Sequence, residues 1–353
     1  MKKFSSLSFF LFALLAIFVF SCEGPAGPPG ADGIDGIAGA DGADGTNGTD
    51  GTNGVDGNAV CLTCHNVAVK TAISADYYIS SHGIGGAVGY AGSRNGCAMC
   101  HSHEGFVETQ FTGLDTTATG FALPQPIQCA SCHDFHETLD FEGDGTDYAL
   151  RASSAVDLFE VPGTTIDFEG SSNLCLNCHQ PRDIAPVEDT VLVGQYVLTN
   201  TRLGPHYGTQ STLLEGIGGY EVAGTVDYPT AYWAHRTMTS CVDCHMVSSA
   251  TVGEGGHTWI PSVDDCVTCH SSATDFDVNG KQTEIDALHL ALEEKLKTAG
   301  LLSETGSIVK GTYPIDQAGA LWNYRTVYYD HSKGVHNYPY IYALLQNSIE
   351  VFN

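Results

Sequence analysis

The chain has 353 residues and a formal net charge of −27 at pH 7, because 41 acidic residues oppose only 14 lysines and arginines. A surface this acidic repels phosphates and anionic headgroups, which excludes nucleic-acid binding and electrostatic adhesion to anionic lipid. It suits a soluble protein outside the cytoplasm. Two reasons for the charge stay open: solubility alone, or attraction of cationic partners that include metal ions.

The first residues have the pattern of an export signal. Lys2 and Lys3 supply positive charge, and the apolar run Phe9–Phe20 is too short to cross a membrane. A small residue directly precedes Cys22, as at the cleavage site that bacterial lipoproteins have. We therefore predict a signal peptide over residues 1–21 and a lipid on Cys22, with an ordinary secretory signal as the alternative.

Glycine then occupies every third position from Gly24 to Gly57, which is the pattern of a collagen triple helix. Only glycine fits at the axis of such a helix. Proline is confined to the first two triplets and acidic side chains recur, so a triple helix here would be short and marginal. We expect residues 22–58 to form a flexible, lipid-anchored, collagen-like stalk, with trimerisation through this segment as the alternative.

The pattern Cys-x-x-Cys-His follows six times and uses every cysteine except Cys22. It is the attachment signature of c-type haem. Two cysteines three residues apart lie on one side of a helical turn, where each can form a thioether with a haem vinyl group, and the histidine can bind the iron. The predicted haem-binding residues are Cys61, Cys64 and His65; Cys97, Cys100 and His101; Cys129, Cys132 and His133; Cys175, Cys178 and His179; Cys241, Cys244 and His245; and Cys266, Cys269 and His270.

Other uses of these cysteines explain the pattern less well. Structural zinc sites combine paired Cys-x-x-Cys halves and leave the histidine after every second cysteine unexplained. A thioredoxin-like redox motif occurs once per domain and does not need that histidine. Disulfides would not repeat this spacing. Six covalently bound haems are the interpretation that uses every residue of the pattern.

Residues 59–353 are therefore expected to form one hexahaem cytochrome c domain. Its core is packed with haem, and its chain is mostly irregular with short α-helices and few β-strands. Short strands are expected near Val191–Leu198 and Tyr220–Val226. Apolar residues at helical spacing predict C-terminal helices over Thr283–Ala299, Gln317–Tyr329 and Pro339–Phe352.

Six haems need six second axial ligands if every iron is six-coordinate. Fifteen histidines are present and the motifs use six, whereas methionine, the competing ligand, is scarce in this region. Bis-histidine ligation is thus the economical interpretation, and it favours low reduction potentials. The predicted second ligands are His82, His136, His206, His235, His257 and His336. His103, His289 and His331 are left without this role, with His103 as the first substitute.

A second metal site is predicted after the sixth motif. Oxygen-bearing residues stand at positions 1, 3, 5, 9 and 12 of a loop that has glycine at position 6 and a helix directly after it, as in a calcium-binding loop. The predicted ligands are Asp275, Asp277, Asn279, the Lys281 carbonyl, Thr283 and Asp286. The final aspartate resembles the dockerin version of this loop. The alternative is an acidic turn that begins a helix.

Four segments resemble multihaem cytochromes c of the extracytoplasmic respiratory kind, in particular the outer-surface cytochromes of metal-reducing bacteria. They are Cys97–Phe106, Ser172–Arg182, Gly204–Gly208 and Gly334–Asn337. The last of them, before a helix, is also similar to pentahaem nitrite reductases. The resemblance implies closely packed haems that pass electrons along a chain, with histidine on both sides of each iron.

Electron transfer is the predicted function, so the protein is expected to be a carrier and not an enzyme. Its partners would be redox proteins or extracellular electron acceptors, and it would be anchored by lipid to the outer membrane, as Glu23 next to Cys22 hints. The alternative is an oxidoreductase that reduces a small nitrogen or sulfur oxyanion at an open haem. That reaction needs a vacant iron position and cationic donors around it. A homotrimer or a polymer of stacked cytochromes is a third interpretation.

Overall fold

The computed structural model describes residues 57–140, 143 and 147–353, which belong to one compact unit, Asp56–Asn353. The predicted signal peptide, the lipidation site Cys22 and the stalk up to residue 56 lie outside the described residues. Within the described ranges, none of the helices combines the length and the apolarity that a bilayer crossing requires.

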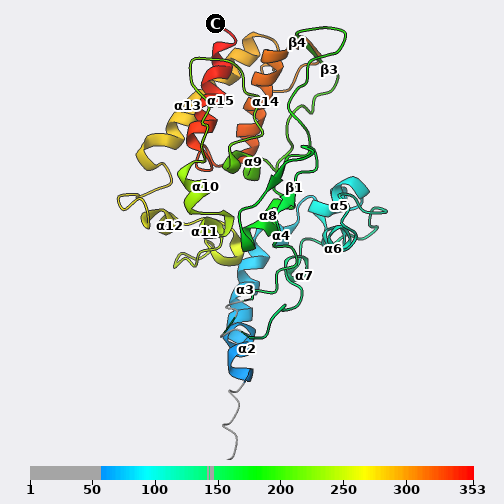
Figure 1. Ribbon diagram of the computed structural model, residues 1–353, viewed down its shortest axis with the longest axis vertical. Helices are drawn as coiled ribbons and strands as arrows, with labels where there is room; N and C mark the ends of the chain where they lie inside the picture. Colours follow the sequence, from blue (N-terminus) through cyan, green and yellow to red (C-terminus); the bar gives the residue numbers. More distant parts are fainter. Residues whose placement is uncertain (1–56, 141–142, 144–146) are drawn as a thin grey trace, which may run out of the picture. The chain divides into compact units, whose positions relative to one another are not determined.

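Helices dominate the described residues, and most of them are short (Figure 1). They are α2 (Gly57–His65), α3 (Val67–Ile79), α4 (Ser81–Ile84), α5 (Asn95–His101), α6 (His103–Thr112), α7 (Cys129–Cys132), α8 (Asn173–Leu176), α9 (Gln210–Glu215), α10 (Ala234–Met238), α11 (Cys241–His245), α12 (Val263–Val267), α13 (Lys281–Thr298), α14 (Ile315–Asp330) and α15 (Tyr338–Glu350). Single turns of other helix types are η1 (Val88–Gly92), η2 (Gly170–Ser172), η3 (Gly256–Thr258) and η4 (Val278–Gly280).

Strands are few and form two separate antiparallel pairs. Strand β1 (Val156–Asp157) pairs with β2 (Thr165–Ile166), and β3 (Gln195–Leu198) pairs with β4 (Gly311–Pro314). The expected strand near Val191–Leu198 is thus confirmed over its second half only. Its first half is a turn, because the Asp189 carboxylate accepts hydrogen bonds from two successive backbone amides.

The expected strand over Tyr220–Val226 is wrong, and two asparagines explain why. Asn323 of α14 accepts a hydrogen bond from the backbone N–H of Tyr220 and donates to its carbonyl. Asn347 of α15 does the same for Val226. The two amide side chains satisfy the backbone groups that a neighbouring strand would otherwise pair with, so the segment needs no sheet partner.

The three C-terminal helices form the main apolar core, as their sequence periodicity predicts. Helices α13, α14 and α15 lie side by side in Figure 1 and bury a continuous cluster that includes Leu292, Leu296, Leu321, Trp322, Ile341 and Leu344. The Asn337 side chain accepts a hydrogen bond from the Tyr340 amide and caps α15, as expected. This bundle is a conventional hydrophobic core that needs no cofactor.

The motif-rich N-terminal half contrasts with that bundle. Among the described residues, neither apolar cluster contains a residue before Val156. Helix α3 has no buried residue, and its apolar side chains are exposed: Val67 is 81% and Tyr78 is 71% exposed. Apolar side chains left in water do not stabilise a fold. This part of the described chain therefore has the exposed apolar surface that the predicted haem-packed core would cover.

Helix α13 offers a matched test of the C-terminal core. Leu292 is fully buried, whereas Leu290 on the same helix is 59% exposed. In the holoprotein, Leu292→Ala should lower the free energy of unfolding by about 2–5 kcal/mol, since it leaves a cavity. Leu290→Ala should cost about 0.5 kcal/mol or less. Urea unfolding followed by far-UV circular dichroism measures both, and equal losses would contradict this core.

Candidate functional site: six pairs of histidines

Each of the six motifs folds as one helical turn that returns the histidine toward the first cysteine. In the third, fourth and sixth motifs the helix ends before the histidine. There the histidine backbone N–H donates to the carbonyl of the first cysteine, at 2.8 Å for His133, 3.0 Å for His179 and 2.7 Å for His270. The twelve motif cysteines are free thiols among the described residues. Both cysteines and the histidine therefore lie on one local surface, as thioether attachment of a planar group requires.

Every motif histidine faces a second histidine from a distant part of the chain. The ring centroids lie 6.1–6.4 Å apart in all six pairs. The pairs are His65 with His136, His101 with His206, His133 with His257, His179 with His82, His245 with His336, and His270 with His235. The six partners are the six histidines that the sequence singles out as second ligands.

The spacing of the rings fits a metal ion between them. Two metal–imidazole bonds of about 2 Å each, with about 1 Å from each nitrogen to its ring centre, give a separation of about 6 Å. The ring planes differ in their mutual angle. It is 90° for His82 and His179 but only 30° for His133 and His257. The residues present therefore fit six-coordinate haem iron, held from both sides by imidazole.

In five of the twelve rings, the Nδ1 nitrogen forms a hydrogen bond that fixes the orientation of the ring. Nδ1 donates to a backbone carbonyl, an amide oxygen or a carboxylate, which leaves Nε2 with the free lone pair that binds metal. The contacts are His133 to Tyr148 O (2.7 Å), His179 to Gln210 Oε1 (3.2 Å), His235 to Val335 O (2.6 Å), His245 to Trp259 O (2.8 Å) and His336 to Asp330 Oδ1 (2.6 Å).

Burial favours the neutral form of six of these twelve rings, and the neutral form is the one that binds metal. Burial and, to a smaller extent, the neighbouring His179 lower the pKa of His82 to about 4. Burial also lowers the pKa values of His101, His179, His206, His245 and His257. Desolvation opposes the charged form of each ring, so protons compete weakly for the nitrogens at neutral pH.

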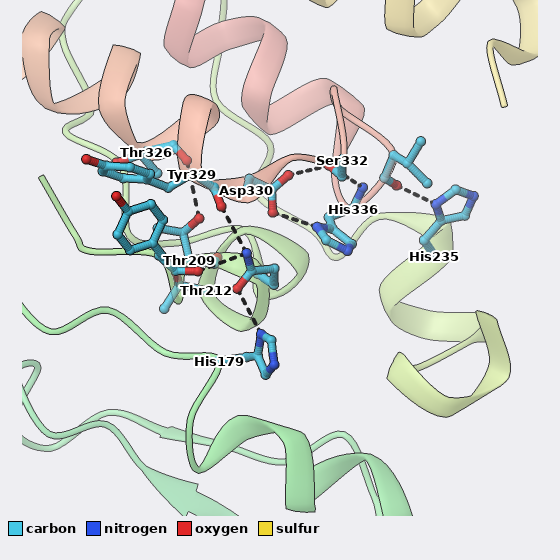
Figure 2. Close-up of polar contacts among 12 residues, drawn as sticks. His179, Thr209, Thr212, His235, Thr326, Tyr329, Asp330, Ser332 and His336 are labelled. Carbon is cyan, nitrogen blue, oxygen red and sulfur yellow. Dashed lines mark hydrogen bonds and ion pairs between the residues drawn. The ribbon is translucent and has the colours of Figure 1, made fainter. Parts of the chain in front are cut away.

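His336 differs from the others because its acceptor is a buried carboxylate (Figure 2). Burial lowers its pKa, but the charge of Asp330 and their hydrogen bond outweigh this effect and raise it. The Asp330 side chain is fully buried and stands at the last residue of α14, where the helix dipole disfavours an anion. It is held by His336 and by the Ser332 hydroxyl.

The three remaining histidines face no motif histidine in the part of the chain that the structure describes. His103 contacts the Ser131 hydroxyl at 2.9 Å, and His289 stacks on Tyr324 with a centroid distance of 4.3 Å. His331 ends α14 in a left-handed conformation. The sequence interpretation leaves these three without a ligand role, which stays a prediction.

The predicted calcium loop has its oxygens engaged by protein groups. Asp277 accepts hydrogen bonds from the Thr283 amide and hydroxyl and thereby caps the first turn of α13. Asp286 forms an ion pair with Lys333 at 2.6 Å. Within residues 57–140 and 147–353, no cluster of three or more His, Cys, Asp or Glu side chains is arranged to hold a metal ion. Calcium binding stays a prediction.

Three residues of the site have no signal in the sequence. Asp330, Gln210 and Trp259 are ordinary residues in motif-free segments, and only the fold brings them against the histidines. The Trp259 carbonyl accepts from His245, and its ring packs against His82 and His257 with centroid distances of 4.5 and 5.6 Å. These residues orient the rings that would bind iron.

No protein-family model and no curated protein matches this chain. Among solved structures, the crystal structure of the outer cell wall cytochrome OcwA matches with a TM-score of 0.47 and 17% sequence identity. The match covers 80% of this chain and 50% of OcwA, so the chain spans half of the length of that protein. A likeness at this level defines neither the fold nor the function.

The calcium prediction is tested by removing the ion. If Asp275–Asp286 binds calcium at about 100 times its Kd, EGTA should reduce the stability of the holoprotein by about 2.7 kcal/mol. Thermal unfolding with and without EGTA measures the change. Asp286→Asn should remove most of this sensitivity, because it removes the ligand at position 12. A thermal midpoint that EGTA does not move would show that the loop is only a turn.

The Asp330 carboxylate should lower the potential of the haem held by His245 and His336. A carboxylate that accepts from a ligand histidine makes the ring a stronger donor and favours the ferric state. Asp330→Asn keeps the shape but removes the charge, so that haem's midpoint should rise by roughly 60 mV, the one-electron equivalent of about 1.4 kcal/mol. Potentiometric titration would refute this role if all six midpoints stayed in place.

Proposed function

We infer that this protein transfers electrons outside the cytoplasm through six covalently bound c-type haems, most or all with two histidine ligands. The observation that carries the inference is the complete pairing of the motif histidines. Six of six face a second histidine at 6.1–6.4 Å, and the partners lie between 35 residues (His235 to His270) and 124 residues (His133 to His257) apart in sequence. Apolar packing alone has no reason to produce this repeated spacing.

Haem iron, when bound, exchanges single electrons between its ferric and ferrous states. The protein's own contribution is to hold each iron from both sides and to keep each ring in one orientation. The hydrogen bonds at Nδ1 serve the second purpose, since a ring that cannot rotate does not release the metal easily. Little reorganisation is then needed when an electron arrives or leaves.

The same pairing argues for a carrier and against an enzyme. Reduction of an oxyanion needs an iron with a free position and cationic groups around the substrate. Each motif histidine here has an opposing histidine, so no pair leaves a side open. Of the cations near the site, Arg236 pairs with Glu215 at 2.5 Å and Arg151 with Asp134 at 2.7 Å. Arg182, near His101 and His206, donates to the Gly96 carbonyl at 2.9 Å.

The placement in the cell follows from the N-terminal sequence. The export signal, the lipid on Cys22 and the collagen-like stalk would hold the haem domain away from the surface of the outer membrane, at the cell surface or on the periplasmic face. Redox proteins or extracellular acceptors would then exchange electrons with it. Trimerisation through the stalk stays an alternative to a monomer.

Mass spectrometry and spectroscopy of the purified holoprotein test this function. We expect a mass increase of six haems per chain and an optical spectrum with low-spin features only. His336→Met should raise the midpoint of one haem, since methionine ligation raises potentials. His331→Met, a control outside the pairs, should change no midpoint.

Three results would contradict the proposal. One is a protein without bound haem. Another is a high-spin charge-transfer band together with binding of nitrite that displaces no ligand, which would favour the oxidoreductase. The last is a His336→Met variant in which all six midpoints stay in place, which would show that the second ligands are wrongly assigned.

A further inference from the structure

The second and fourth motifs touch through their cysteines. The Cys100 thiol contacts the Asn177 carbonyl and the Cys178 thiol contacts the Met99 carbonyl, both at 4.0 Å, and the two thiols share a hydrogen bond. Around them, Gln110 donates to the Asn177 side chain at 3.1 Å. The haems attached at these two motifs would therefore be direct neighbours.

The fourth and fifth motifs also touch. Cys175 lies next to Cys241, and Ser172 donates to the Ser240 hydroxyl at 2.8 Å. Near the same two motifs, Gln210 contacts both the His179 ring and the Tyr329 carbonyl.

Tyr329 precedes Asp330, the acceptor for His336 (Figure 2). His179, a predicted ligand of the fourth haem, and His336, a predicted ligand of the fifth, are thus connected through Gln210 and the adjacent residues Tyr329 and Asp330.

The third motif approaches the fourth from another direction, and its Cys132 lies near Cys175. Trp259 packs between the second ligands of both haems, with its ring against His257 and edge-on to His82. Its backbone is left-handed, with φ of 57°, a strained conformation for a tryptophan that the surrounding contacts must stabilise.

The first motif is linked to the third, and the sixth to the fifth. His136, which faces His65, lies three residues after His133, and the Tyr77 hydroxyl of α3 donates to the Ile127 carbonyl just before the third motif. These contacts join the first haem to the third.

At the other end, His235 donates to the Val335 carbonyl, next to His336. Helix α11 packs against α12, and Cys244 lies near Cys266. The sixth haem therefore adjoins the fifth.

From these contacts we propose that the fourth haem is a three-way junction in a branched chain, joined to the second, third and fifth haems. The proposal rests on the electron-transfer function above and specifies its route. The first haem extends the branch that leads through the third haem, and the sixth haem ends the branch that leads through the fifth. Electrons that enter at one end divide at the fourth haem between two exits, so one carrier serves two acceptors.

Distal-ligand variants test the junction in the intact holoprotein. His82→Met places the fourth haem at the highest potential, so one equivalent of dithionite electrons converts that iron alone from ferric to ferrous, diamagnetic iron. Electron paramagnetic resonance before and after this step should show changes in the ferric signals of three other haems, because spin coupling reaches only close neighbours. His235→Met is the matched control at the sixth haem, the end of one branch, and only one other signal should change.

Intermediate variants keep the test decisive if His82→Met fails to bind its haem. His257→Met and His336→Met each remove one neighbour of the fourth haem, so these two variants and His206→Met should all change one common ferric signal. A linear chain predicts that no haem is common to all three, and that result would overturn the junction. If instead a variant keeps six bis-histidine signals and no raised midpoint, the ligand assignment of the proposed function fails, and not the branching.

Discussion

The structure depends on one geometric constraint, the opposition of two imidazole rings across a gap of about 6 Å, repeated six times. Each pair brings a local motif next to a remote residue. A metal ion bound between the two rings would therefore be a long-range cross-link in a chain whose helices are mostly short. The six closures position the loops between them. An iron that bridges each pair would contribute to the folding free energy, as metals do wherever the apoprotein lacks its own core.

Two kinds of core coexist in the compact unit. Helices α13–α15 bury leucines, isoleucines and Trp322 in the ordinary way. The described residues before Val156 contribute to neither apolar cluster and expose large apolar side chains such as Phe111, which is 91% exposed. Helix α14 of the bundle ends at Asp330, which accepts a hydrogen bond from His336. Before Val156, the haems proposed above would supply the apolar contacts that side chains do not supply.

Much of the site was predictable from sequence because haem attachment is a local pattern. Two cysteines and a histidine at fixed spacing single out His65 and its five equivalents, and counting spare histidines against scarce methionines singles out the six histidines that face them. The pairing could not be predicted. His82 precedes the second motif but faces His179 of the fourth, because the partner is chosen by tertiary packing over long separations. Asp330 and Trp259 were missed for the same reason.

The C-terminal helices followed from apolar periodicity, whereas Tyr220–Val226 did not form the expected strand, since asparagine side chains replaced a sheet partner. Direct observation of iron coordination tests the central claim most sharply. A crystal structure of the holoprotein should place each of six irons between a motif histidine and the second histidine paired with it here. An iron with one protein ligand, or a pair such as His179 and His82 with no iron between them, would contradict the account.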